Sequence, residues 1–590
     1  MSYKISLLHA TRGRSEKAKA CRDLWLNSAE NPNQIEHIFA IDDDDMDSLT
    51  NISSTRVIVP RGKGCVQAWN AAAEKCSGDI LIQLSDDWVP TKNWDTTILN
   101  EFADQEGECV LAISDGHRTD DLLCMAILNR KRYQKQGFLF HPAFISVFSD
   151  DYFTWAAKKD GVLKNAKHIV FEHQHPIFGK AQMDATYQHS NSPDKFAHGH
   201  LTFNTLTREG ETSTICLAMI VKNEIKNMRK CLESVKGIID YWVICDTGST
   251  DGTQQLIKDL MTEFGIPGEL HERPWVDFAS NRSESLALAR SKAKYTLVID
   301  ADDYLEVLHS PEVFKTLKQD HYHMQIMHGG LTYHRPQLVR NDFEWTYKGV
   351  LHEFLAPPAN TRISPPMILD NVIMRAAASD TRNGFSGTKK YISDALILEK
   401  ALLDDTLDIG MQTRYWFYLA QSYRDAGEFD RCLKSYTKRV ELEGWPEEVY
   451  YSKYMIARCK VHLKYSEADI IDAYISAWEY RPGRVDALFD LILYLVDKKR
   501  FAYAYALATI GIKIPPTTDT LFVRKDIFQW RMLDTYSILC MQTGNRAEAI
   551  KAATAIVQSP HFTSLVPEIE RERIKKNLEV FNTAAPALVQ

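Results

Sequence analysis

The chain has 590 residues, and its 70 Lys and Arg against 78 Asp and Glu give a net charge of −8 at pH 7. This length suggests three or four domains. An apolar content of 45% and a charged content of 25% exclude a disordered or fibrous chain. The mild acidity gives no general electrostatic footprint for nucleic acid, although a local basic groove is compatible with it.

The expected compartment is the cytosol. Eleven cysteines are scattered singly without CxxC pairs, as is typical of reduced thiols. No apolar run approaches the roughly 18 residues needed to span a bilayer. The start, MSYKISLLHATRGR, lacks the pattern of a secretory signal.

The first 190 residues alternate short apolar runs with stretches of helical spacing. The runs of strand length are Ile5–Ala10, His37–Ile41, Arg56–Val59, Ile80–Leu84 and Val110–Ile113, and the helical stretches are Ser15–Asn27 and Cys65–Lys75. This alternation predicts a mainly parallel sheet with helices on its faces. A polar stretch over residues 190–213 is interpreted as a linker.

The same alternation restarts at Ile215. The predicted strands are Ile215–Val221, Tyr241–Cys245 and Tyr295–Ile299, and the predicted helices are Ile225–Val235 and Thr253–Phe264. A Pro-rich irregular stretch, 356–367, follows. Two α/β units in tandem are therefore expected in about the first 360 residues.

After about Thr388 the pattern is helical throughout. Helix-hairpin turns are expected near Gly427, Lys464, Arg500 and Gly544. The segments 415–436 and 533–552 share an aromatic or large apolar residue, small residues at the helix crossing and a Gly turn. This layout resembles the tetratricopeptide repeat, whose stacked helix pairs form a solenoid. An ordinary helical bundle is the alternative.

Three polar clusters follow predicted strands of the second unit: 222–224, 246–253 and 300–303. In open α/β sheets ligands bind at that carboxyl edge. Asp246 is suited to accept hydrogen bonds from a base or ribose. Asp300 and Asp302, two positions apart, are expected on one side of the chain, where paired carboxylates suit a hard divalent cation. Such an ion neutralises charge on a departing diphosphate.

Residues 215–353 resemble a family 2 glycosyltransferase of the GT-A fold, through the segment AMIVKNE, the DTGSTDGT run and the acidic cluster at 300–303. The resemblance implies a uridine diphosphate sugar as donor, with Mn²⁺ or Mg²⁺ held by Asp302 on its diphosphate. The implied nucleotide-sugar-binding residues are Asn223, Glu224, Asp246, Asp251, Arg282 and Asp300. For Arg282, a surface salt bridge on a helix is the alternative.

The segment 345–353, WTYKGVLHE, resembles the part that closes the sugar site in the related enzymes that carry helical repeats. This resemblance implies that His352 completes a metal shell and that Glu353 is the base that deprotonates the acceptor. A hydrogen-bonded structural role is the alternative for His352.

The first unit resembles a divergent copy. Its clusters HATR, DDDD and SDD follow strands, and a Gly-containing turn, RGKG, precedes the last of these strands. Thr11, Arg12, Asp42 and Lys63 are the expected donor contacts, and Asp87 the expected metal ligand. No DxSxDxT segment is present and Ser85 replaces the first DxD carboxylate. Surface solvation is the alternative for Arg12 and Lys63.

Two downstream features of the first unit favour a working site. The segment 148–155, FSDDYFTW, resembles the acidic-aromatic motif that supplies the catalytic base in inverting members, which implies that role for Asp150 or Asp151. Capping of a helix is their alternative function. His173 and His175 lie on one side of a strand end, within reach of a metal.

The expected fold class is therefore α/β, with two GT-A domains at 1–195 and 211–360, plus an all-α repeat domain at 385–585. The expected activity is a metal-dependent, inverting glycosyl transfer of the hexosyltransferase type, with both sites or only one active. The helices would bind a protein, peptide or glycan acceptor, or dimerise the enzyme; a modified nucleobase acceptor stays open. The alternative is a scaffold whose sugar-nucleotide folds have decayed.

Overall fold

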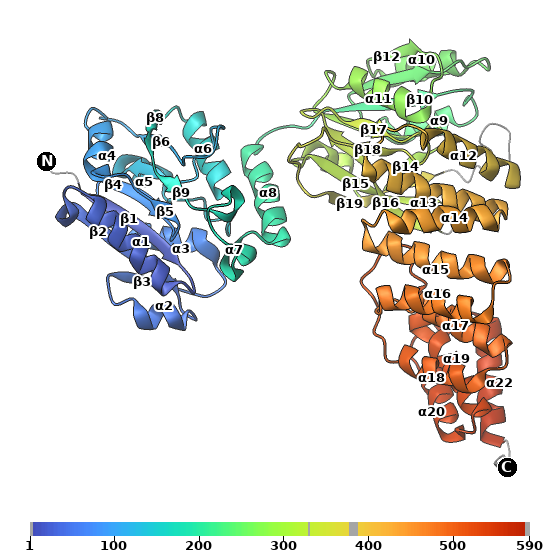
Figure 1. The fold of residues 1–590 in the computed structure, drawn as a ribbon. Helices are drawn as coiled ribbons and strands as arrows, with labels where there is room; N and C mark the ends of the chain where they lie inside the picture. Colours follow the sequence, from blue (N-terminus) through green and yellow to red (C-terminus); the bar gives the residue numbers. More distant parts are fainter. Residues whose placement is uncertain (1–3, 329–330, 377–386, 584–590) are drawn as a thin grey trace. The chain divides into compact units, whose positions relative to one another are not determined.

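A computed structural model describes residues 4–328, 331–376 and 387–583, and the chain divides into two compact units. The larger comprises Met1–Val276, Asn281–Thr346 and Leu355–Ala377 and contains two α/β domains. The smaller comprises Asp277–Ser280, Tyr347–Phe354 and Ala378–Gln590 and is mostly helical (Figure 1). No described helix combines the length and apolarity needed to cross a membrane.

The first domain is built on a seven-stranded sheet of order β3-β2-β1-β4-β7-β6-β8. The strands are β1 (Ile5–Thr11), β2 (Ile35–Asp42), β3 (Arg56–Val59), β4 (Ile80–Leu84), β6 (Val110–Ser114), β7 (Ile127–Asn129) and β8 (Leu163–Val170). The first four pair in parallel, and β7 is antiparallel to both β4 and β6. A separate pair joins β5 (Trp88–Val89) to β9 (Glu172–His173).

Helices and side chains bury both faces of this sheet. The helices are α1 (Ser15–Ser28), α2 (Met46–Asn51), α3 (Gly64–Lys75), α4 (Trp94–Phe102), α5 (Arg130–Gln136), α6 (Ser149–Lys159) and α7 (Ala185–Ser190). Trp25 and Trp94 are fully buried on one side, with Phe171 between them and β8. Val66 and Phe140 belong to a second buried cluster. The predicted central strands are confirmed to within two residues at their ends.

The second domain repeats this plan with an eight-stranded sheet of order β12-β11-β10-β13-β16-β15-β19-β14. The strands are β10 (Ile215–Val221), β11 (Tyr241–Asp246), β12 (Gly268–Glu272), β13 (Tyr295–Val298), β14 (Tyr304–Val307), β15 (His321–His328), β16 (Leu331–Arg340) and β19 (Met367–Ala376). Helices α9 (Met228–Val235), α10 (Thr253–Phe264) and α11 (Phe278–Ala289) lie between the parallel strands in the sequence. Strand β19 lies beyond residue 360, the boundary we expected for this domain.

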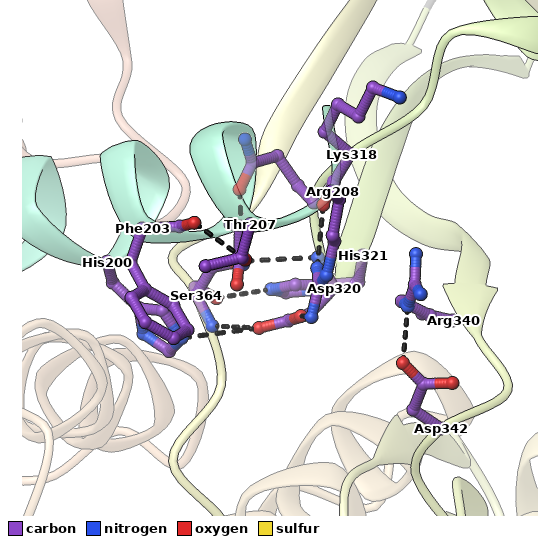
Figure 2. A network of polar contacts seen from close by, with 12 residues as sticks. His200, Phe203, Thr207, Arg208, Lys318, Asp320, His321, Arg340, Asp342 and Ser364 are labelled. Carbon is purple, nitrogen blue, oxygen red and sulfur yellow. Dashed lines mark hydrogen bonds and ion pairs between the residues drawn. The ribbon is translucent and has the colours of Figure 1, made fainter. Parts of the chain in front are cut away.

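The prediction of a linker over residues 190–213 is wrong, because this stretch contains helix α8 (Pro193–Thr207). Proline at its first turn suits a helix start. Gly199, His200 and Asn204 are buried although the helix is polar. The apolar pattern failed here because the buried residues of α8 are small or polar, and His200 and Arg208 approach Asp320 of the second domain (Figure 2).

The remaining helices are α12 (Thr388–Ala401), α13 (Ile409–Ala426), α14 (Phe429–Glu441), α15 (Pro446–His462), α16 (Glu467–Tyr480), α17 (Asp486–Asp497), α18 (Phe501–Gly511), α19 (Met532–Gln542), α20 (Arg546–Val557), α21 (Phe562–Leu565) and α22 (Glu568–Thr583). Each long helix packs mainly on its neighbours in the sequence (Figure 1). The four predicted hairpin turns fall at or beside the breaks between these helices. This stacking is that of a helical repeat array.

The packing of α8 gives the first prediction. A Cβ atom on Gly199 would lie 2.4 Å from the Val147 carbonyl oxygen and 2.9 Å from the Phe148 ring. Gly199→Ala should therefore destabilise the larger unit by about 1–3 kcal/mol, as overpacking does. Thermal unfolding measures this. Gly107→Ala, where a Cβ meets nothing within 4 Å, is the control; equal melting temperatures for the two variants would contradict the close approach.

Candidate active sites

In the second domain, hydrogen bonds join the turn after β10 to the turn after β11. The Asn223 Oδ1 accepts the Thr250 N–H at 2.8 Å, and the Asp251 Oδ2 accepts the Ile225 N–H at 3.2 Å. The Glu224 N–H donates to Thr253 Oγ1 at 2.9 Å. The fold thus brings the two predicted clusters together. In this arrangement Asn223 and Asp251 hold the loops in place through their side-chain oxygens.

Asp246, at the end of β11, has one carboxylate oxygen that accepts hydrogen bonds and one without a hydrogen-bond partner. It is 1% exposed, and its Oδ1 accepts from the Gly248 and Ser249 amides and from Gln254 Nε2, each at 2.9 Å. Burial raises the pKa of Asp246, but these donors outweigh burial and lower it. Its Oδ2 is buried and has no hydrogen-bond donor. Such atoms are rare in proteins.

Carboxylates gather where β13 ends. Burial, followed by the charge of Asp300, raises the pKa of Asp302. Burial also raises the pKa of Glu224, with the charges of Asp302, Asp251 and Asp300 adding to the effect. Arg282 is buried on α11, and its Nη1 lies 2.6 Å from Asp300 Oδ1. Arg282 therefore lies beside this acidic cluster.

His352 and Glu353 lie in the smaller unit, where their segment packs on α13. The His352 ring stacks on Tyr418 with centroids 3.9 Å apart, and its carbonyl accepts from Arg414 Nη2 at 2.6 Å. The Val350 N–H donates to the Tyr415 hydroxyl at 3.0 Å. Proximity of His352 and Glu353 to a metal or an acceptor stays a prediction.

In the first domain, the end of β1 is tied to the end of β4 through Asp86. His9 Nε2 lies 2.9 Å from Asp86 Oδ1, and Thr11 Oγ1 donates to Asp86 Oδ2 at 3.1 Å. All three side chains are buried. Thr11, a predicted donor contact, thus makes an internal hydrogen bond. Sequence reasoning assigned no role to Asp86 or His9.

The other predicted donor contacts of this domain lie near the surface. Arg12 pairs with Asp42 and, at 2.6 Å, with Asp44. The Asp44 hydrogen bond opposes burial and raises the pKa of Arg12. Lys63 is exposed just before α3. Arg12 and Asp42 therefore satisfy each other in this structure.

Asp87 and His173 meet because β5 pairs with β9, with Trp88 opposite His173. His173 Nε2 lies 3.4 Å from Asp87 Oδ2, and the Tyr187 hydroxyl donates to the same oxygen at 2.9 Å. Burial raises the pKa of Asp87, but these two partners outweigh burial and lower it. Asp87 Oδ1 is buried without a hydrogen-bond partner.

His175 lies beside His173 and Tyr187, the two partners of Asp87. Its ring centroid lies 5.2 Å from that of His173 and 4.9 Å from that of Tyr187. Burial, followed by the neighbouring His173, lowers the pKa of His175, which favours the neutral imidazole that metals bind. Tyr187 was missed because its contact with Asp87 joins residues 100 positions apart.

Asp150 and Asp151 lie in the first turn of α6. The N-cap is Phe148, with a φ of +68° that is unusual for a bulky residue, so neither Asp is the capping residue. Burial raises the pKa of both, and the charge of Asp150 helps to raise that of Asp151 to about 6. A carboxylate tuned in this way is suited to accept a proton near neutral pH.

The first domain has a small pocket lined in part by residues 113–125 and by Trp88. Its walls include Trp88, whose ring stacks on His173 at 4.1 Å between centroids. They also include Arg118 and Cys124, and Arg118 lowers the pKa of Asp150 and Asp151 through its charge.

Within the described ranges, no three His, Cys, Asp or Glu side chains form a ready-made metal site. A divalent ion at either sheet edge would therefore need further ligands, such as water or diphosphate oxygens.

Comparison with known proteins identifies the α/β domains. The model of the family "Glycosyl transferase family 2" matches residues 19–154 and 216–367, together just under half of the chain. The two α/β domains are therefore glycosyltransferase family 2 domains, and an α-helical array follows them.

Two curated relatives match a short part of the chain. A TPR repeat-containing protein of Synechococcus elongatus is 36% identical over 92 residues, 15% of this chain and 21% of that protein. The SPbeta prophage-derived glycosyltransferase SunS of Bacillus subtilis is 35% identical over 95 residues, 16% of this chain and 21% of SunS. The matched part thus spans about a fifth of each relative.

Solved structures with partial similarity include S. aureus TarS 1-349 in complex with UDP-GlcNAc, at 13% identity and a TM-score of 0.26, covering 46% of this chain and 92% of that one. Another is MamA, at 18% identity and a TM-score of 0.23, covering 32% of this chain and 92% of that one.

The raised pKa of Asp151 gives the second prediction. Because folding raises this pKa from 3.8 to about 6, the charged form destabilises the fold above about pH 6, and the penalty disappears as the pH falls towards 4. Asp151→Asn should therefore stabilise the larger unit by about 1–2 kcal/mol at pH 7.5 and by about half as much at pH 5.

Thermal unfolding at the two pH values checks this, with Asp104→Asn, at an exposed loop position, as the control. A stabilisation by Asp151→Asn that is the same at both pH values would contradict the burial argument.

Proposed function

We propose that the protein transfers a sugar from a nucleotide-sugar donor, of the uridine diphosphate class, to an acceptor with inversion, assisted by Mn²⁺ or Mg²⁺. The observation that carries this proposal is the crowding of Glu224, Asp300 and Asp302 at the end of β13 in a family 2 domain. Carboxylates that raise one another's pKa are stabilised by a cation placed among them.

At each sheet edge, acidic and imidazole side chains would hold a divalent ion together with water or diphosphate oxygens. In the second domain Asp302 would hold it, with Asp300 beside it; in the first, Asp87, whose Oδ1 lacks a partner, would hold it with His173 and His175. Such an ion supplies positive charge that stabilises a departing diphosphate. A role for His352 as a metal ligand stays a prediction from the sequence.

The nucleoside is proposed to lie at the loops after β10 and β11. The unpartnered Asp246 Oδ2 is suited to accept from a base N–H or a ribose hydroxyl. Arg282 would place its guanidinium near the donor, since it already lies beside Asp300. In the first domain Thr11, Arg12, Asp42 and Lys63 take the donor role, with Arg12 leaving its pairs to meet phosphate.

Inversion needs one carboxylate that accepts the proton of the attacking acceptor group. In the first domain Asp151 is the proposed base: its raised pKa makes it a better proton acceptor, and Asp150 beside it raises that pKa further. The acceptor oxygen would form its bond to the anomeric carbon as the bond to the diphosphate breaks, and its proton would pass to Asp151. A role for Glu353 as the base of the second domain stays a prediction from the sequence.

The helical array is proposed to bind the acceptor, which is a protein, peptide or glycan, or to dimerise the enzyme. The competing function is a scaffold in which one or both domains bind no donor. The pairing of Arg12 with Asp42 and Asp44 favours that alternative for the first domain, because it occupies groups that a donor would need.

A screen of sugar nucleotides for hydrolysis tests the transferase proposal. We expect at least one of Asp87→Asn and Asp302→Asn to reduce turnover by about 100-fold or more without unfolding the chain, because charge stabilisation of the leaving group would be lost. Asp259→Asn, at an exposed carboxylate on α10, should turn over normally. Normal turnover by both test variants would make the metal assignments wrong.

Binding of UDP gives an independent test of the donor site. Isothermal titration should show binding that strengthens when Mn²⁺ is added, and Asp246→Asn should weaken it by about 10-fold or more, since the Asn amide would put a donor where an acceptor is needed. Gln255→Ala, on the exposed part of α10, is the matched control. Metal-independent binding, or no binding, would favour the scaffold.

A further inference from the structure

Arg362 belongs to the second domain but contacts the first. It lies in the Pro-rich segment between β18 (Phe354–Ala356) and β19. Its Nη1 is 3.6 Å from Asp151 Oδ1, and its guanidinium carbon is 3.7 Å from the centroid of the Phe148 ring. The same guanidinium lies 4.5 Å from the Phe196 ring of α8. One cation therefore contacts both the proposed base and the residue that starts its helix.

Phe148 is the point where these contacts converge. Its positive φ is costly for an aromatic residue and persists only where neighbours enforce it. His200 of α8 stacks on its ring at 4.6 Å between centroids, and Gly199 lies against the preceding carbonyl. The first turn of α6, with Asp150 and Asp151, is thus fixed by α8 and Arg362.

The segment that carries Arg362 is itself anchored by a buried charge. Asp320 is 0% exposed, and its Oδ2 accepts the Ser364 N–H at 2.7 Å (Figure 2). Its Oδ1 lies 2.8 Å from Arg208 Nη2, and His200 Nε2 lies 3.5 Å from its Oδ2. His321 Nε2 contacts the Ser364 carbonyl at 3.0 Å. Because Ser364 is two residues from Arg362, this network restricts the position of the backbone that carries the Arg362 side chain.

We propose that Arg362 is a positioning residue for the first active site, supplied by the second domain, so that the base Asp151 is oriented and kept ionised only while the two domains are docked through α8. This inference rests on the proposed transferase function. It explains why two family 2 domains share one compact unit: the site of the first is incomplete without a residue of the second.

The charged groups around Asp151 determine how removal of Arg362 changes the pKa of Asp151. Asp150 precedes it on α6, Arg118 acts from the loop before β7, and Arg362 acts from the second domain. Cys124 faces Asp150 from the same loop as Arg118. Burial and Asp150 raise the pKa of Asp151, and the two arginines lower it. Without Arg362 more of the base is therefore protonated at neutral pH.

The experiment compares Arg362→Gln and Arg362→Lys with the parent chain, using Arg229→Gln as the matched control because Arg229 forms an exposed ion pair on α9. Carbodiimide and glycinamide label protonated carboxyl groups, and mass spectrometry of the peptide holding Asp151 gives the labelling midpoint against pH. Arg362→Gln should raise this midpoint by about one pH unit. Arg362→Lys should raise it less, since it keeps the charge but loses the flat contact with Phe148.

Turnover is measured on the same variants in an Asp302→Asn background, so that only the first domain contributes. The acid limb of kcat should move up with the labelling midpoint, with the KM for the donor unchanged. A midpoint that Arg362→Gln leaves in place overturns the inference. A midpoint that moves while neither the parent chain nor the Asp302→Asn chain turns over any sugar nucleotide rejects the transferase proposal and retains the contact between Arg362 and Asp151.

Discussion

Carboxylates held close together at the end of a buried strand repel one another. This repulsion is the main constraint on the acidic cluster at the end of β13 in the second domain. Asp300, Asp302 and Glu224 stay together because β10 and β13 are neighbouring parallel strands and the loops that follow them are fixed by hydrogen bonds. Burial makes the repulsion stronger, as the pKa values of Asp302 and Glu224 indicate. Arg282 offsets part of it at Asp300. A divalent cation would offset the rest.

In the first domain the charge of Asp87, the predicted metal ligand that corresponds to Asp302, is balanced differently. The charged form of Asp87 is stabilised by His173 and by the Tyr187 hydroxyl, so its pKa is lowered where that of Asp302 is raised. Arg12 is likewise paired with Asp42 and Asp44. The carboxylates with raised pKa values in this domain are instead Asp150 and Asp151. The two domains thus share a fold and differ in how their charges are balanced.

The sequence predicted the buried strands well because continuous apolar runs are a local signal. Ile80–Leu84 and Ile215–Val221 match residue for residue, as does the helix Thr253–Phe264. It did not predict α8, whose buried residues are small or polar and whose His200 and Arg208 contact Asp320, more than 100 residues away. Strand β19 was missed for a related reason: it pairs with β14 and β15 in a Pro-flanked region.

The candidate sites were predictable to the extent that they follow strands. The clusters after β10, β11 and β13 could be placed at one sheet edge from the sequence because parallel strands share that edge. The contacts of Asp87 with Tyr187 and of Asp151 with Arg362 could not, since each joins residues distant in the chain and no periodic pattern encodes such a pair. The internal hydrogen bonds of Asn223 and Asp251 were also beyond local patterns.

We have proposed that acidic side chains at two sheet edges hold a divalent ion against a nucleotide. The most direct measurement is a crystal structure of the full chain soaked with a uridine diphosphate sugar and Mn²⁺, with the anomalous signal used to locate manganese. We expect manganese beside Asp302, beside Asp87 or at both, with the diphosphate on it and the nucleoside of the second domain at Asp246. A crystal structure in which neither sheet edge holds metal or nucleotide at saturating concentrations would contradict this proposal.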